Sequence, residues 1–423
     1  MAASTKWDRI WLGGHLATMR GGGDLLGEIH NGAIACMDGR ISWVGEEEDL
    51  PGRPEELARD VVDVDGCWIT PGLVDCHTHM VFAGDRSREF EARLHGATYE
   101  EIARKGGGIR TTMYATREAS EEDLFRVSGR RLRVLMAEGV TTVEIKSGYG
   151  METGTELRML KTARRLGETH PVDVQTSFLG AHVVPPEFDG RRGAYVDLLC
   201  KEMIPKAVEA KLADSVDAFC DEIAFTFDEC RAVLRAALEL GLPVRLHADQ
   251  LSDQGGASLA ANLGARSADH LERTSIGGVN DMAAAGTVAV LLPGAFYFLQ
   301  DNQPPPVASF REAGVPMALG TDLNPGSSPL NSLLTALNLA CVLFRLTPEE
   351  ALMGVTCNGA RALGLHGTKG SLEIGKTADL AIWEIGHPRE LSYWVGKNPC
   401  VGVVKDGEST LSFSAPGPPD LRG

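Results

Sequence analysis

Four short segments, far apart in the sequence, carry side chains that can bind a metal ion. They are LVDCHTHM with His77 and His79, VRLHADQ with His247, SADHLE with His270, and ALGTDLNPG with Asp322. Successive side chains of a strand point to opposite faces, so the two histidines of the HTH motif share one face. Imidazole nitrogens at this spacing suit zinc or iron. An isolated pair of histidines is as often packed in a core, but the three further candidates predict a mononuclear metal centre for metal-assisted hydrolysis.

Each of these segments ends an apolar run typical of a buried strand, and amphipathic stretches separate most of the runs. The sequence contains eight such runs, at 73–77, 140–146, 173–180, 216–221, 243–247, 266–270, 288–293 and 316–322. Eight buried parallel strands, each followed by a helix, predict a (β/α)8 TIM barrel of the α/β class. The candidate ligands come at the carboxyl ends of the strands, where barrel active sites lie.

The two ends of the chain differ from this pattern. Residues 1–71 and 367–412 contain short β-like runs separated by Gly, Asp and Asn, which predict a small composite β-sandwich built from both ends. The barrel is then expected over 72–366. The segment 413–423 is rich in Pro and Gly and is expected to be a flexible tail.

Composition excludes several classes of partner. The formal net charge of −17 disfavours nucleic acid and anionic membranes, so an anionic substrate needs a local cluster of Arg or His. Nine cysteines without regular spacing indicate reduced thiols. The chain shows no signal-peptide pattern at its start and no apolar run near the roughly 20 residues of a membrane helix. A cytoplasmic protein is expected.

Over nearly its whole length the chain resembles the amidohydrolase superfamily, a distorted barrel with a flanking β-sandwich. VDAFCDEIAF has no lysine to bridge a second ion, and this points to the one-metal subgroup. The motifs HTHMVFAGDRSREF, KGGGIRTT, EIKSGYGMETGTELRML, LGAHVVPPE, HADQLS and TDLNPGSSP resemble the imidazolonepropionase family within it. The resemblance implies one zinc or iron ion and a homodimer. It also implies four metal ligands: His77, His79, His247 and Asp322.

The same resemblance implies a reaction. It is hydrolysis of the cyclic amide of 4-imidazolone-5-propanoate to N-formimidoyl-L-glutamate, the third step of histidine degradation. A metal-bound hydroxide would attack the ring carbonyl. Asp322 could ligate the ion and take the proton from the attacking water, and His270 could orient that water or stabilise the oxyanion. His270 has the alternative interpretation of a hydrogen-bonded core histidine.

The resemblance also implies a set of substrate-binding residues. Arg86 has a planar fork that suits the propanoate carboxylate, although a solvated surface arginine is the commoner case. The neighbouring Arg88 and Arg93 are predicted to be surface residues. In the NPGSS turn, backbone N–H groups could bind the amino-acid end of the product, or the turn could simply lead into a helix. The full predicted set is Arg86, Tyr149, His182, Gln250, Asn324, Gly326 and Ser327.

Gln250 departs from several one-metal relatives, which have Glu at this place. A glutamine cannot transfer a proton, but its amide can both donate to and accept from a ring amide. This residue counts against the alternative of a deaminase acting on another heterocycle, which must protonate a leaving amine. A different one-metal cyclic amidohydrolase remains the second hypothesis. A non-enzymatic scaffold protein of this fold would be expected to lose metal ligands, and all four are present.

Overall fold

The parallel barrel predicted from the sequence is present in the computed structural model, which describes residues 6–20, 25–97 and 107–411. Eight parallel strands follow one another around it in the order of the sequence. They are β6 (Leu73–Asp75), β7 (Val140–Lys146), β8 (Asp173–Ala181), β9 (Ser215–Cys220), β10 (Arg245–Ala248), β11 (Ser267–His270), β12 (Val288–Leu291) and β13 (Met317–Leu319). Strands β6 and β13 end earlier than predicted, so His77, His79 and Asp322 lie just beyond the strands that lead to them.

The barrel closes where the first and last strands continue into these ligand segments. No ladder joins β6 to β13, but the Asp322 N–H donates to the His77 carbonyl at 2.9 Å, and the His79 N–H donates to the Leu323 carbonyl at 3.0 Å. Below them, the Asp75 carboxylate accepts hydrogen bonds from the N–H and the hydroxyl of Thr321. The hydrogen bonds that close the barrel are therefore made by the two segments that contain the predicted ligands His77, His79 and Asp322.

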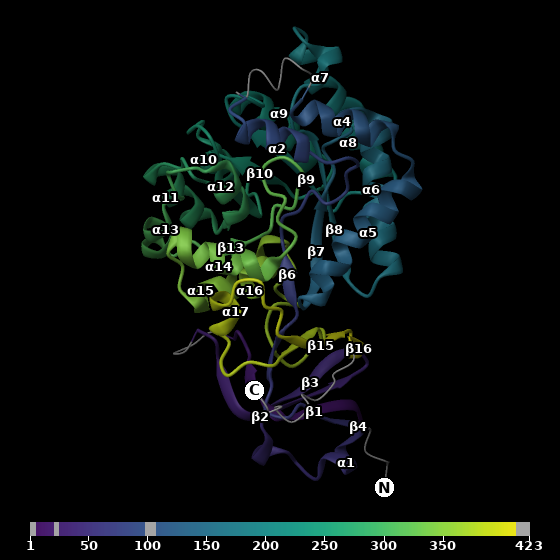
Figure 1. The fold of residues 1–423 in the computed structure, drawn as a ribbon, viewed down its shortest axis with the longest axis vertical. Coiled ribbons are helices and arrows are strands. Elements are labelled where there is room, and N and C mark those ends of the chain that lie inside the picture. Colours follow the sequence, from purple (N-terminus) through teal and green to yellow (C-terminus); the bar gives the residue numbers. More distant parts are fainter. Residues whose placement is uncertain (1–5, 21–24, 98–106, 412–423) are drawn as a thin grey trace.

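Helices surround the barrel (Figure 1). In α5, Ser120 accepts a hydrogen bond from the Asp123 N–H at the N-terminus, and Leu124, Leu132 and Leu135 face the core. In α9, Thr226 and Glu229 form a capping box. The helices are α2 (Ser87–Leu94), α4 (Ile109–Glu118), α5 (Glu121–Ala137), α6 (Thr153–Thr169), α7 (Arg192–Leu198), α8 (Ile204–Glu209), α9 (Phe227–Glu239), α10 (Gly256–Asn262), α11 (Ile276–Ala285), α12 (Pro293–Leu299), α13 (Val307–Ala313), α14 (Leu333–Phe344), α15 (Pro348–Gly354), α16 (Cys357–Ala362) and α17 (Glu390–Tyr393).

A second, mixed sheet lies at one end of the barrel (Figure 1). Its strand order is β16-β15-β14-β5-β1-β2-β3, with β4 paired to β1, so that β14 from the late part of the chain pairs with β5 from the early part. The strands are β1 (Trp7–Ala17), β2 (Glu28–Met37), β3 (Arg40–Glu46), β4 (Ala58–Asp63), β5 (Trp68–Pro71), β14 (Leu380–Trp383), β15 (Cys400–Lys405) and β16 (Glu408–Leu411); the short helix α1 (Pro54–Leu57) precedes β4.

This arrangement confirms the predicted fold class, a barrel with a smaller β unit drawn from both chain ends. The smaller sheet has its own buried cluster, which includes Trp11, Ile34, Ile69, Leu380 and Val404. The residue numbers predicted for the domain boundaries stay a prediction, and the predicted tail at 413–423 lies outside the described part of the chain.

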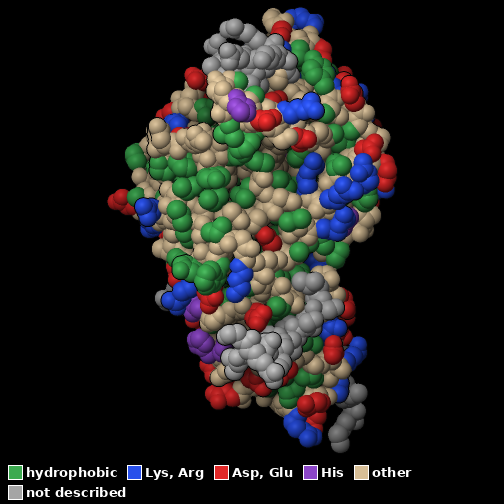
Figure 2. Space-filling view, viewed as in Figure 1, with side chains coloured by type: hydrophobic (Ala, Val, Ile, Leu, Met, Phe, Trp, Pro, Cys, Tyr) green, Lys and Arg blue, Asp and Glu red, His purple; other side chains and the backbone are tan. Residues whose placement is uncertain are grey.

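The charges on the surface are mixed. Figure 2 shows acidic and basic side chains next to one another on the visible face. No helix within the described ranges is both long and apolar enough to span a membrane.

Candidate metal centre

Four predicted ligands converge at the carboxyl end of the barrel. His79 Nε2 lies 3.3 Å from each of His77 Nε2, His247 Nε2 and Asp322 Oδ1, and His77 Nε2 lies 3.5 Å from Asp322 Oδ1. Donors placed 2.0–2.1 Å from a tetrahedral ion are separated from one another by about 3.4 Å. All four side chains are almost fully buried. Their spacing and chemistry therefore fit one divalent ion.

Two carboxylates lie behind the histidines. The Nδ1 of His77 makes a hydrogen bond of 2.6 Å with Asp269 Oδ2, so Nδ1 carries the proton and Nε2 presents its lone pair towards the other ligands. The Nδ1 of His247 lies 3.1 Å from Asp217 Oδ2, close enough for electrostatic attraction but without hydrogen-bond geometry.

Two buried cations hold these carboxylates in turn. Lys146 Nζ lies 2.8 Å from both Glu144 Oε1 and Asp217 Oδ2, and Arg245 Nη2 lies 3.0 Å from Asp269 Oδ2. All five side chains are at most 1% exposed. We call Glu144, Lys146, Asp217, Arg245 and Asp269 the buried charge network.

Burial and neighbouring charges shift the pKa values of several side chains at the site. Burial, followed by the neighbouring cations and imidazoles, holds the pKa values of His77 and His79 well below the usual range. Burial raises the pKa of Asp322, although nearby imidazoles oppose this. Burial alone would raise the pKa of Asp217 as well, but Lys146 and His247 hold it well below its ordinary value. The imidazoles of His77 and His79 are thus neutral near pH 7, the form that binds a metal ion.

His270 ends β11 beside the same cluster. Its ring centroid lies 5.3 Å from that of His247, and one of its nitrogens lies within 4.8 Å of the donor atoms of His77 and Asp322. Burial lowers its pKa to about 3, so the ring is neutral near pH 7 and can donate or accept a hydrogen bond. His270 and Leu271 have φ values of 79° and 74°, a left-handed conformation that is strained for such residues and clusters at functional sites.

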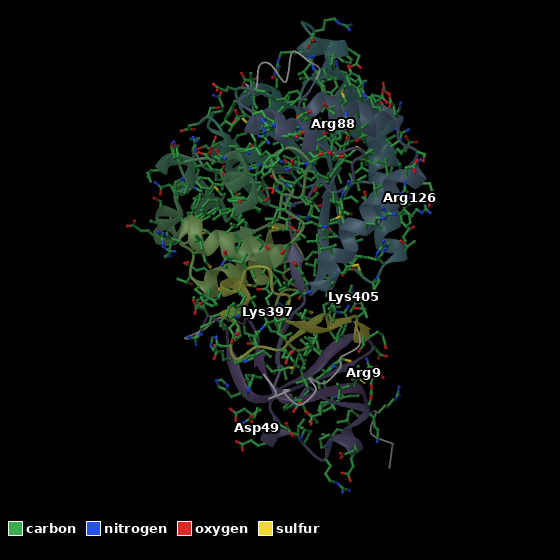
Figure 3. The ribbon with its side chains drawn as sticks, in the orientation of Figure 1. Arg9, Asp49, Arg88, Arg126, Lys397 and Lys405 are labelled. Atoms are coloured by element: carbon green, nitrogen blue, oxygen red, sulfur yellow. The ribbon has the colours of Figure 1, made fainter. Side chains whose placement is uncertain are left out.

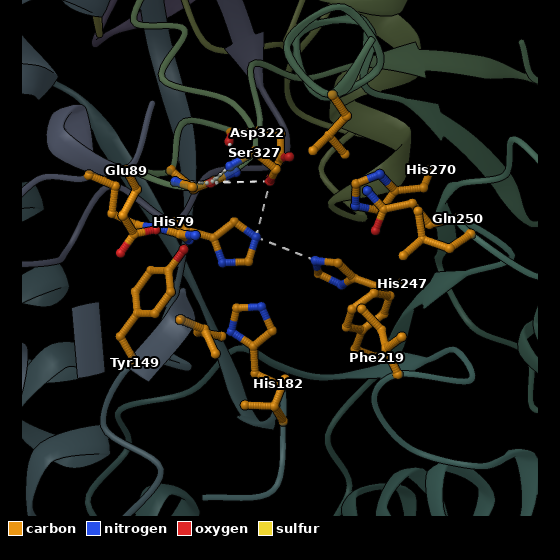
Figure 4. A pocket seen from close by; sticks show the side chains of 18 of the residues that line it. His79, Glu89, Tyr149, His182, Phe219, His247, Gln250, His270, Asp322 and Ser327 are labelled. Carbon is orange, nitrogen blue, oxygen red and sulfur yellow. Dashed lines mark hydrogen bonds and ion pairs between the residues drawn. The ribbon is translucent and has the colours of Figure 1, made fainter. Parts of the chain in front are cut away.

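A cavity of about 470 Å³ opens above His79, His247 and Asp322, three of the four predicted ligands (Figure 4). Glu89 and Tyr149 lie on one side of it, and Gln250 and His270 lie on the other. Every predicted substrate-binding residue lines this cavity: Arg86, Tyr149, His182, Gln250, Asn324, Gly326 and Ser327. The structure therefore brings together the whole predicted site.

Comparison with known proteins agrees with this geometry. Residues 68–410 match the model of the amidohydrolase family. The chain belongs to the amidohydrolase family. It is 57% identical over 405 residues to an imidazolonepropionase of Ralstonia nicotianae, covering 96% of this chain and 99% of that protein. It is 54% identical over 404 residues to one of Shewanella sp. (strain ANA-3), covering 95% and 99%. These relatives place the chain among the imidazolonepropionases.

Solved structures of distant relatives share the fold. An adenosine deaminase from Xanthomonas campestris with bound zinc is 18% identical, with a TM-score of 0.67 over 97% of this chain and 94% of that one. An atrazine chlorohydrolase from Arthrobacter aurescens TC1 complexed with zinc is 15% identical, with a TM-score of 0.68 over 96% and 95%. At these identities the likeness supports the architecture of this amidohydrolase.

Three residues of the cavity present polar groups towards a ligand. The side-chain amide of Gln250 makes no hydrogen bond within the described ranges, and Gln250 is 8% exposed. The His182 Nδ1 donates to the Gly148 carbonyl at 3.0 Å, which leaves Nε2 as an acceptor. Burial raises the pKa of Tyr149, so its hydroxyl is a neutral hydrogen-bond donor.

The loop that carries Tyr149 is held by a buried glutamate that the sequence analysis did not single out. The Glu156 carboxylate accepts hydrogen bonds from the N–H groups of Gly148, Gly150 and Met151, at 2.7–2.8 Å. A carboxylate with three backbone donors fixes the path of this loop, and therefore the place of the Tyr149 ring in the wall of the cavity.

The N–H groups of the NPGSS turn make hydrogen bonds within the turn itself. The sequence left two interpretations open, a turn that binds the product and a plain turn into a helix. The N–H groups of Gly326 and Ser327 both donate to the Asn324 side-chain oxygen, at 2.8 and 2.7 Å. The turn is closed by its own first residue, which is the usual behaviour of Asn in turns. These residues line the cavity, and their role in binding stays a prediction.

Several residues of this amidohydrolase site were not predicted from the sequence. The prediction that Arg93 is a surface residue was wrong, because it lines the cavity and lies over the Phe298 ring; Arg88 is exposed as predicted (Figure 3). The buried charge network was also missed. Its signal was present, since Glu144 and Lys146, and likewise Arg245 and His247, are two residues apart and therefore share one face of a buried strand.

Proposed function

We propose that this amidohydrolase opens the ring of 4-imidazolone-5-propanoate by adding water, giving N-formimidoyl-L-glutamate. The observation that carries the proposal is one cavity with His79, His247 and Asp322 at its floor, His77 buried 3.3 Å from His79, and Arg86 in its wall. The two imidazolonepropionases that the chain resembles along nearly their whole length support it. The proposed ligands are His77, His79, His247 and Asp322, and the proposed ion is zinc or iron, because three imidazoles and a carboxylate suit either.

A divalent ion at these donors supplies Lewis acidity, which polarises a carbonyl and lowers the pKa of a water ligand to about 7. The chain supplies the proton transfers. The Asp322 carboxylate has a second oxygen that can take a proton from the attacking water, and the neutral His270 ring can orient that water or donate a hydrogen bond to the oxyanion. The proton then passes to the ring nitrogen as the C–N bond breaks.

The remaining residues bind and orient the substrate. Arg86 pairs with the propanoate carboxylate through two parallel N–H···O bonds. Gln250 has an unengaged amide that can donate to and accept from the ring amide, and the Tyr149 hydroxyl donates from the opposite wall. His182, stacked on His79 at a centroid distance of 5.4 Å, offers an acceptor nitrogen. Asn324, Gly326 and Ser327 complete the cavity next to Arg86.

The test is direct. Purified protein of measured metal content is incubated with freshly generated 4-imidazolone-5-propanoate, and loss of ultraviolet absorbance is followed with and without a chelator. We expect fast loss that the chelator stops and that added zinc or iron restores, with N-formimidoyl-L-glutamate as the product. Stoichiometric metal without turnover would refute this substrate and favour another cyclic amide.

We also propose a homodimer in the cytoplasm. The support is an exposed apolar strip at the end of α17, where Tyr393, Trp394 and Val395 have relative exposures of 68%, 48% and 70%. Light scattering of the purified protein measures its mass in solution. A monomer at micromolar concentration would contradict the dimer.

A further inference from the structure

Glu89 is a cavity-lining carboxylate that the proposed reaction does not use. It lies on α2, its side chain is 17% exposed, and both of its oxygens are engaged. Oε2 accepts from Arg86 Nε at 2.8 Å, and Oε1 accepts from the Gly108 N–H at 3.0 Å and the Thr111 hydroxyl at 2.9 Å. Glu89 therefore ties Arg86 to the first turn of α4.

Arg86 is confined on its other side by Gly326. A Cβ atom built on Gly326 would lie 2.2 Å from Arg86 Nη1 and 3.2 Å from Cζ, so the guanidinium rests directly on the backbone of the NPGSS turn. Only a residue without a side chain allows this contact. Among the residues that the structure describes, no group accepts a hydrogen bond from Nη1 or Nη2 of Arg86.

The contacts with Glu89 and Gly326 determine which edge of the Arg86 guanidinium faces a ligand. A guanidinium can receive a carboxylate at its Nη1–Nη2 edge or at an edge that includes Nε. Glu89 occupies Nε, which leaves the Nη1–Nη2 edge. Glu89 is itself negative, so its charge opposes an anionic ligand, and attraction cannot be its contribution. Glu89 instead holds Arg86 in one conformation before the ligand arrives. Without Glu89, the long Arg86 side chain would lose rotamer entropy when it binds the ligand.

We propose that Glu89 is a positioning residue that holds Arg86 over Gly326, and that this arrangement makes a carboxylate arm the specificity determinant of the substrate. The inference rests on the proposed function, because it concerns the substrate of the same cavity. It adds one position, Glu89, and gives Gly326, already in the predicted substrate-binding set, the specific role of seating the Arg86 guanidinium.

The experiment measures binding without turnover. Metal-loaded protein is titrated calorimetrically with imidazole-4-propanoate and with imidazole-4-propanamide, which differ only in the charged arm. The variants are Glu89→Gln, which removes the charge and leaves an amide N–H₂ where Oε1 or Oε2 accepted, and Gly326→Ala, which displaces Arg86 without changing any charge. Arg86→Ala gives the limit for complete loss of the arginine, and Glu91→Gln, an exposed position on the same helix, is the matched control.

We expect the wild type and Glu91→Gln to prefer the acid over the amide by roughly ten- to a hundredfold, as for a charge-assisted hydrogen-bond pair. In Glu89→Gln and Gly326→Ala the preference should fall towards the Arg86→Ala value, whereas affinity for the amide and metal content stay within about twofold. A purely structural role would weaken both ligands equally.

Three other outcomes are distinguishable. A wild-type preference retained in both Glu89→Gln and Gly326→Ala overturns the inference. Equal binding of acid and amide by the wild type overturns it too, and removes Arg86 from the proposed function. A wild type that prefers the acid but does not hydrolyse 4-imidazolone-5-propanoate refutes the proposed reaction and leaves the role of Glu89 standing.

Discussion

The two ends of the barrel use charged side chains for different purposes. At the amino end, Asp173 begins β8 and lies 2.5 Å from Lys369 and 3.2 Å from Lys405, which also pair with Asp379. Lys405 lies where the barrel meets the smaller sheet (Figure 3). These pairs join the barrel to the smaller sheet. At the carboxyl end, the acidic side chains face buried histidines and the cavity, and several polar groups have no partner of their own.

The two ends of the barrel differ in whether their polar groups have partners within the protein. Pairs such as Asp173 with Lys405 satisfy both members, so their effect is on stability. Around the cavity, the Gln250 amide and the His270 Nδ1 lack hydrogen-bond partners within the described ranges, although His270 is almost fully buried. Unpaired buried groups cost free energy in the absence of a ligand and therefore mark where a ligand binds. The comparison predicts large effects on activity at one end and small effects on stability at the other.

The largest effect is expected at Asp322. Asp322→Ala removes a metal donor and a proton acceptor together, so kcat should fall by about 10⁴-fold or more. Because burial already raises the pKa of this carboxyl, its removal should not lower the thermal stability of the metal-free protein. Turnover assays and thermal melts measure the two quantities. Activity near that of the wild type would remove Asp322 from both roles.

The second-largest effect is expected at Asp269, because its carboxylate lies between the proposed ligand His77 and the cation Arg245. In Asp269→Asn the affinity for zinc should fall by roughly ten- to a hundredfold, as happens when a carboxylate behind a metal-binding histidine is lost. Equilibrium dialysis measures the affinity. Asp173→Asn, the same change at the other end of the barrel, is the control and should leave zinc affinity unchanged. Equal losses in both variants would contradict the division between the ends.

Gln250→Glu tests the unpaired amide of the cavity. Burial and the nearby Asp322 should raise the pKa of the new carboxyl above its usual value of about 4.3, so kcat/KM should gain an additional ionisation on the acid side. Metal content should not change. Gln254→Glu, an exposed position in the same loop, is the control. A pH profile identical to that of the wild type would mean that residue 250 does not face the reacting groups.

The smallest effect is expected at the amino end. Burial alone would raise the pKa of Asp173, but Lys369 and Lys405 hold it below its ordinary value. A carboxyl with a lowered folded-state pKa stabilises the protein above its unfolded pKa of about 3.9, and this contribution is lost as the pH falls through the folded value. Asp173→Asn should therefore cost about 0.5–1 kcal/mol at pH 7, given its partial exposure, and the difference should shrink progressively as the pH falls below about 3.9.

Calorimetric melts across this pH range measure the Asp173→Asn difference. The kcat of Asp173→Asn should equal that of the wild type. A loss of activity at pH 7 would show that the amino end also supports the metal centre, and the comparison would fail.

The sequence predicts the barrel and its ligands because both depend on regular spacing. Apolar runs alternate with helices, and the HTH motif places two imidazoles on one face. The buried charge network was harder to predict, because charged residues inside strands such as β7 contradict the usual exclusion of charge from a core. Contacts across the chain, such as Glu89 with Gly108 or Asn324 with its own turn, have no periodic signal. They depend on where loops meet after folding.

The closure of the barrel links the integrity of the fold to the state of the active site. The Asp322 and His79 N–H groups make the last hydrogen bonds between the first and eighth strands. Any opening of the barrel at this join separates Asp322 from His77 and His79 at once. Amide hydrogen exchange at these two positions therefore reports, without substrate and without an assay, what fraction of the molecules is ready to react.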